Sequence, residues 1–132
     1  MNLPMRFARS LLALSLLAAP AAAAEWRQAS EHELRLSSFD IEPATLRLKA
    51  GQPVRLRFVN TSEVGYSLSA AEFFRAAQLR QRDSGAVAGG TVSIGPGQTR
   101  EIALVPAAGR YTMRSGNLFH RIMGMRGRII VE

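Results

Sequence analysis

A single histidine and several methionines lie close together near the C-terminal end of the chain. Met113, His120, Met123 and Met125 fall within one thirteen-residue stretch. A neutral imidazole binds copper or zinc, and thioether sulfurs are soft ligands that favour Cu(I). The stretch therefore suits a His-Met or His-Met-Met copper site formed by His120 with one or two of Met113, Met123 and Met125.

Each of these side chains also has a purely structural interpretation. A lone His more often makes a structural hydrogen bond than it binds a metal, and Met commonly fills irregular gaps in a core. Met113 alternates with Tyr111 and Ser115 on an expected strand. This alternation favours a core position for Met113 but places it on the same side of the strand as Ser115. The residue types alone leave both interpretations open.

The spacing around His120 follows a recognisable pattern. The chain has Gly109-Arg-Tyr111, then Ser115 four residues later, His120 five residues after that, and finally Gly124-Met125. This resembles the C-terminal metal loop of the cupredoxins, the small copper β-sandwiches, in which a Cys stands at the place of Ser115. The resemblance implies that His120 and Met125 occupy metal-ligand positions.

Two of the four ligand positions depart from that family. A blue-copper centre needs two His and one Cys in a trigonal plane with a weak axial Met. The chain contains no Cys, and Tyr66 stands six residues after Asn60, where the resemblance implies a second His. We therefore expect Tyr66 and Ser115 to be vestigial ligand positions whose hydroxyls bond each other or nearby backbone. Ser115 lacks a nucleophile elbow and an acidic orienting partner, so an enzyme is not expected.

Short segments of alternating polarity dominate the chain after residue 30. Strands are predicted over residues 33–41, 45–49, 54–60, 67–69, 91–94, 101–105, 111–115 and 128–131, and Pro43 suits an edge or a strand switch. Ser69 and Glu72 have the spacing of a capping box, which predicts a helix over about residues 70–82. With the resemblance, this predicts an all-β fold, a cupredoxin-like antiparallel Greek-key β-sandwich with one short helix.

The N-terminal segment has the features of a secretion signal. Arg6 and Arg9 precede an apolar run of roughly 10 residues, which is too short to span a bilayer, and Ala22-Ala-Ala24 suits a cleavage site. We expect a signal peptide over residues 1–24, a cupredoxin-like domain over residues 25–132 and a location in the periplasm. No stable membrane span should remain after cleavage. The alternative is that the apolar run anchors the protein in a membrane.

The charge balance is basic, with 17 Lys and Arg against 10 Asp and Glu. The basic residues are scattered along the chain, and with the expected periplasmic location this argues against nucleic acid as a partner. Arg114, Phe119, Arg121 and Arg126 surround the His120 loop. An apolar centre with a cationic rim would suit docking of an acidic periplasmic partner protein. The alternative is that these are ordinary solvated arginines.

Three functions are compatible with these residues to different degrees. The first is a periplasmic copper-handling protein that holds Cu(I) through His120 and Met125 without a blue type 1 centre. The second is a metal-free cupredoxin-fold module for binding or assembly. The third, an electron-transfer protein, suits the family but conflicts with the missing Cys.

Overall fold

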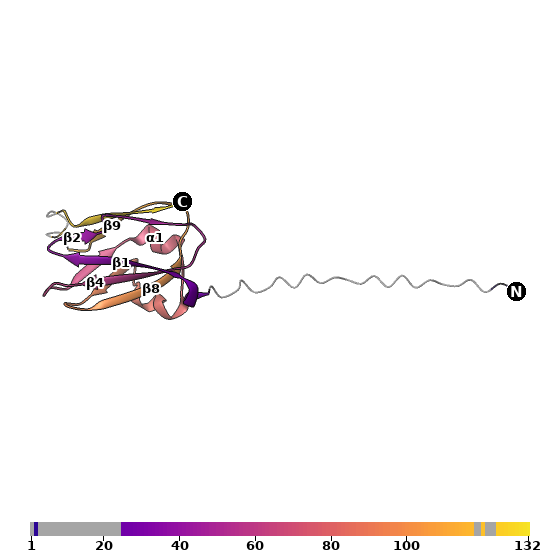
Figure 1. Ribbon diagram of the computed structural model, residues 1–132, viewed down its shortest axis with the longest axis horizontal. Coiled ribbons are helices and arrows are strands. Elements are labelled where there is room, and N and C mark those ends of the chain that lie inside the picture. The colour runs from indigo at the N-terminus through magenta and orange to yellow at the C-terminus, as the bar shows by residue number, and fades with distance from the viewer. Residues whose placement is uncertain (1, 3–24, 118–119, 121–123) are drawn as a thin grey trace.

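The computed structural model describes residue 2, residues 25–117, residue 120 and residues 124–132. Two five-stranded sheets face each other and form a sandwich (Figure 1). The first sheet has the order β2 (Asp40–Glu42), β1 (Ser30–Ser37), β4 (Val54–Asn60), β8 (Thr99–Val105) and β6 (Gln78–Leu79). The second sheet has the order β3 (Thr45–Leu48), β10 (Arg126–Val131), β9 (Gly109–Ser115), β5 (Tyr66–Ser69) and β7 (Thr91–Ile94).

The alternating sequence pattern determines which side chains lie between the sheets. In β4, Leu56 and Phe58 are fully buried, whereas Arg55 and Arg57 on the other face are only half-buried. Burying one such apolar side chain contributes roughly 1.5–3 kcal/mol. The predicted all-β sandwich is therefore confirmed, and its core lies between the inward faces of the two sheets.

Two strand pairs within the sandwich are parallel. β1 pairs in parallel with β4, and β10 pairs in parallel with β3, while the remaining pairs are antiparallel. The chain changes sheet at Pro43, because β2 ends at Glu42 in the first sheet and β3 begins at Thr45 in the second. The strand switch expected from Pro43 is therefore present.

The predicted helix over residues 70–82 was too long. The helix α1 spans only Ala71–Ala76, and a 3₁₀ segment, η2, spans Gln81–Ala86. Between them lies β6, which pairs with β8, so hydrogen bonds to a sheet edge replace those of a longer helix. The capping box was also wrong: Ser69 pairs with Thr91 in the sheet, and the helix begins without a side-chain cap.

The N-terminal part of the described domain begins with another 3₁₀ segment, η1 (Trp26–Gln28), which leads into β1. The predicted signal peptide lies outside the described residues, apart from residue 2. No helix in the described ranges has both the length and the apolar character needed to cross a bilayer.

Candidate metal site

His120 lies at the end of the sandwich where β9 leads into the C-terminal loop. Its Nδ1 atom is 3.2 Å from the hydroxyl oxygen of Ser115, a hydrogen-bonding distance. The imidazole also lies against two aromatic rings, Phe39 at 5.4 Å and Tyr66 at 5.3 Å between ring centroids. The structure thus brings together Tyr66, Ser115 and His120, three of the positions singled out in the sequence.

Ser115 is the centre of a small network of hydrogen bonds. Its side chain is buried, and its hydroxyl accepts a bond from the backbone N–H of Asn117 at 3.2 Å, so a bond to nearby backbone is present as expected. Its own backbone N–H donates to the carbonyl of Met125 at 3.3 Å. The Met125 N–H in turn donates to the carbonyl of His120 at 2.9 Å. These bonds tie the main chains of His120 and Met125 to the end of β9.

The described methionines near the site are core residues in this structure. The Met125 side chain is fully buried, and Met113 is also buried, on the same face of β9 as Ser115. Both belong to the apolar cluster between the sheets. Met125 follows Gly124, whose backbone has a φ of +92°, a value that residues other than glycine rarely adopt. Met123 lies outside the described residues.

Asn60 fixes the loop that leads to Tyr66. Its amide nitrogen donates to the carbonyl oxygens of Val64 at 2.7 Å and Gly95 at 2.9 Å. Its side-chain oxygen accepts bonds from the backbone N–H and the hydroxyl of Ser62. A buried amide with its donors and acceptor in use holds the chain firmly. Tyr66 begins β5 directly after this loop and is buried against His120.

Phe39 is a site residue that the sequence analysis missed. Ser38 and Phe39 form the two-residue turn between β1 and β2, and both have positive φ values, 46° and 68°. Such turns normally use Asn, Asp or Gly, and a bulky residue there is strained. The strained turn places the Phe39 ring against His120. The sequence carried no signal for this turn, because Ser38 and Phe39 are not usual turn residues and lie within the single strand predicted over residues 33–41.

Among the described residues at this end of the sandwich, the candidate donors suit a soft metal ion. Within the described ranges there is no cluster of three or more His, Cys, Asp or Glu that could hold a metal. The described candidate ligands are the His120 imidazole and the Met113 and Met125 thioethers, which suit Cu(I) at low coordination number and are a poor match for Zn²⁺ or Cu(II). His120 Nδ1 would have to exchange its Ser115 contact for the metal, or bind the metal through Nε2.

Two of the predicted docking arginines face each other across the β9–β10 pair. Arg114 and Arg126 are direct partners in the register, and both are exposed. Neither forms an ion pair with another described residue. Like charges opposite each other in a sheet are unfavourable. Phe119 and Arg121, the other predicted docking residues, lie outside the described residues.

A family model described as a cupredoxin-like domain matches residues 8–131. The chain belongs to the cupredoxin-like family. Among curated proteins, no significant match exists. Solved structures nevertheless share the fold of this cupredoxin-like protein. Auracyanin A from Chloroflexus aurantiacus, described as a "blue" copper protein, is 18% identical with a TM-score of 0.55, covering 79% of this chain and 99% of its own.

Two further structural relatives support the same cupredoxin-like fold. Dithionite-reduced auracyanin from Roseiflexus castenholzii is 16% identical with a TM-score of 0.59, and the match covers 79% of this chain and 98% of that one. McoA, a multicopper oxidase from Aquifex aeolicus, is 17% identical with a TM-score of 0.62, but only 30% of it is covered against 80% of this chain. At these identities the likeness shows the fold.

Proposed function

We propose that this cupredoxin-like protein is a non-enzymatic copper-handling protein of the periplasm that holds Cu(I) as cargo through His120 and Met125. The observation that carries the proposal is the direct tie between these two residues. The Met125 N–H donates to the His120 carbonyl at 2.9 Å, so the buried thioether and the imidazole belong to one small loop closed on β9. Thioether and imidazole donors without a thiolate favour Cu(I).

The chain's own residues orient the proposed site. Phe39 and Tyr66 lie on the imidazole and limit its rotation, while Ser115 is within hydrogen-bonding distance of Nδ1. Buried apolar surroundings of Met125 also limit access of water to a bound ion. Met113 or Met123 would complete the coordination, and no blue type 1 centre would form because the chain contains no Cys.

Competition for Cu(I) against a chelator tests this proposal. The purified protein should bind one Cu(I) ion, and both His120→Ala and Met125→Leu should weaken binding strongly. His32→Ala is the matched control, because His32 is the only other histidine and lies on β1, where its contact is Ser30. Undiminished binding in both site variants would exclude a site on His120 and Met125.

A second candidate, a metal-free module for binding or assembly, is favoured by one observation. His120 Nδ1 already has Ser115 within hydrogen-bonding distance, and two aromatic rings flank the imidazole, so the site has internal contacts without a metal. Metal analysis of protein purified from its native compartment separates the two candidates. Stoichiometric copper supports the first, and consistently metal-free protein supports the second.

A further inference from the structure

A basic groove lies on the outer face of the first sheet, away from the metal loop. Its volume is about 540 Å³, and it is lined by Glu25, Trp26, Arg27, Arg55, Arg80, Arg82 and Glu101. The segments η1 and η2 contribute its walls, while β4 and β8 contribute Arg55 and Glu101 from the sheet. Arg55 is near the start of β4, whereas Asn60 at the far end of the same strand fixes the loop beside Tyr66.

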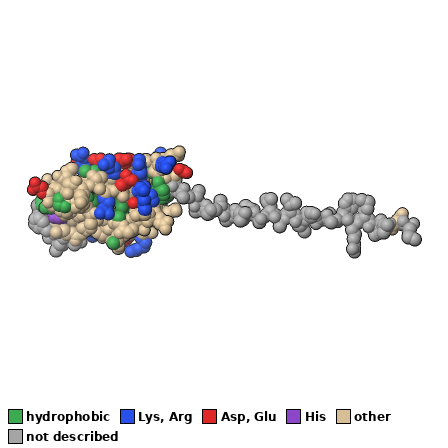
Figure 2. Space-filling model, turned by 90° about the horizontal axis from the view of Figure 1, so that it is seen from below, with side chains coloured by type: hydrophobic (Ala, Val, Ile, Leu, Met, Phe, Trp, Pro, Cys, Tyr) green, Lys and Arg blue, Asp and Glu red, His purple; other side chains and the backbone are tan. Residues whose placement is uncertain are grey.

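The groove has an excess of positive charge. Four of its lining residues are arginines and two are glutamates. Figure 2 shows acidic and basic side chains gathered on one face of the domain, close to the N-terminal end of the described part. Arginine is well suited to carboxylate and phosphate groups because its planar guanidinium can donate two parallel hydrogen bonds.

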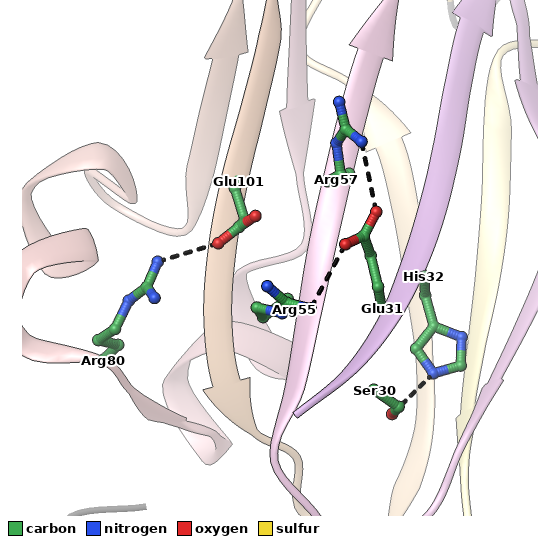
Figure 3. A network of polar contacts seen from close by, with 7 residues as sticks. All are labelled: Ser30, Glu31, His32, Arg55, Arg57, Arg80 and Glu101. Atoms are coloured by element: carbon green, nitrogen blue, oxygen red, sulfur yellow. Dashed lines mark hydrogen bonds and ion pairs between the residues drawn. The ribbon is translucent and has the colours of Figure 1, made fainter. Parts of the chain in front are cut away.

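Arg80 is held in place by two carboxylates, which already balance its positive charge. Its side chain donates to Asp83 at 2.8 Å. It also donates to Glu101 at 3.3 Å (Figure 3). Burial by itself would lower the pKa of the Arg80 guanidinium, but the hydrogen bonds and negative charges of Asp83 and Glu101 raise that pKa above its ordinary value. Arg80 therefore remains charged, and its two carboxylate partners hold its side chain in one position at the side of the groove.

The other arginines have unused hydrogen-bonding capacity. Arg55 forms an ion pair with Glu31 at 3.5 Å, yet its Nε atom is buried without any hydrogen-bond partner (Figure 3). A ligand in the groove cannot reach this inaccessible Nε atom, but the Arg55 side chain is 31% exposed, so another part of its guanidinium can face a ligand. Arg27 and Arg82 are exposed and take part in no ion pair with the described residues. Trp26, half-buried, adds a flat aromatic surface.

We propose that this groove is a binding site for an oxyanion, a carboxylate or phosphate group carried by a small molecule or a lipid headgroup. Arg27 and Arg82 supply the free positive charge, the partly exposed end of the Arg55 guanidinium adds to it from the sheet, and the apolar part of the ligand packs on Trp26. The volume is within the ~300–1,000 Å³ typical of small-molecule sites. The proposal is independent of copper, because neither His120 nor Met125 is among the residues that line the groove.

Trp26 makes the test direct, because it is the only tryptophan in the chain and so reports on this groove alone. Its fluorescence is followed while inorganic phosphate or citrate is added at constant ionic strength. Sedimentation with phosphatidylglycerol vesicles, against phosphatidylcholine vesicles, separates a lipid-borne phosphate from a free one. We expect saturable binding of at least one of these anionic probes.

Two double variants with equal loss of charge make the result specific. Arg27→Gln with Arg82→Gln should weaken binding about tenfold or more, as expected for the loss of one or two charge-assisted hydrogen bonds. Arg47→Gln with Arg100→Gln removes two exposed arginines outside the groove and should leave binding within about twofold of wild type. No saturable binding of any probe, or equal losses in the two double variants, would overturn the proposal.

Discussion

The Phe39 ring lies tilted by 53° against the His120 imidazole, although 81 positions separate the two residues in the chain and Phe39 sits in a left-handed turn to reach it. A bulky residue with positive φ costs of order 1–3 kcal/mol. The aromatic contact with His120 offsets about 0.5–1.5 kcal/mol of this conformational cost. The strained turn places the Phe39 ring against the imidazole, where it restricts the orientation of the imidazole.

Replacing Phe39 separates the backbone strain at residue 39 from the effect of its ring on the position of the His120 imidazole. Phe39→Gly should be more stable than Phe39→Ala by about 1 kcal/mol, because glycine accepts the positive φ and alanine does not. Both variants should shift the NMR signals of the His120 ring, since the ring current of Phe39 is lost. His32 gives an internal reference because it lies on β1 in contact with Ser30. Unchanged His120 signals in both variants would mean that Phe39 does not position the imidazole.

A second prediction concerns the replaced ligand positions. Tyr66 and Ser115 both lie beside His120, so Tyr66→His with Ser115→Cys should supply the two missing ligands of a blue-copper centre. We expect the double variant to bind Cu(II) with intense blue absorption and the unmodified protein to show none. Ser115→Cys alone is the control and should bind Cu(II) more weakly, because it still lacks the second imidazole. A folded but colourless double variant would show that the assumed ligand register is wrong.

A third prediction concerns the stability of the η2 segment. The Asp83 carboxylate is buried and accepts hydrogen bonds from Arg80 Nε at 2.8 Å and from the Ala103 N–H at 2.9 Å. Asp83→Asn removes the charge that pairs with Arg80 and should lower the free energy of unfolding by about 2 kcal/mol. Glu101→Gln, whose side chain is 33% exposed, should cost less than about 1 kcal/mol. Urea unfolding of both variants checks the order, and equal losses would contradict it.

Sequence patterns were sufficient to predict the β-sandwich and part of the candidate metal site. Alternating polarity predicted a strand over residues 54–60, which β4 matches, and its inward residues Leu56 and Phe58 are fully buried. The spacing from Tyr111 to Met125 identified the loop in which Ser115 and His120 meet. These features depend on local periodicity and on spacing within one segment, which a single sequence records.

The remaining features depend on contacts between distant segments. The end of α1 at Ala76 reflects the pairing of β6 with β8, which no local propensity indicates. The contact between Phe39 and His120 depends on a strained turn with an atypical sequence. The basic groove requires η1 and η2 to lie over the same sheet, so arginines far apart in the sequence come together only in the fold.

The last prediction concerns the opposed pair Arg114 and Arg126 beside the metal loop. Two like charges in register weaken the β9–β10 pair, so Arg126→Glu should turn the repulsion into an attraction and stabilise the fold by about 0.2–1 kcal/mol. If an acidic periplasmic protein docks on this end, the same change should weaken that interaction. Docking should also fall steeply with salt in the wild type, because exposed charges are screened over about 10 Å at 0.1 M ionic strength.

Arg47→Glu is the control for this docking prediction, because Arg47 is exposed on β3 and takes part in no ion pair with the described residues. Thermal unfolding measures stability, and pull-downs from periplasmic extract at low and high salt measure docking. We expect Arg126→Glu to melt at a higher temperature while losing salt-sensitive partners that Arg47→Glu retains. A gain in stability without selective loss of partners would show that the Arg114–Arg126 pair is an unfavourable contact with no role in docking, and that no docking site exists at this end.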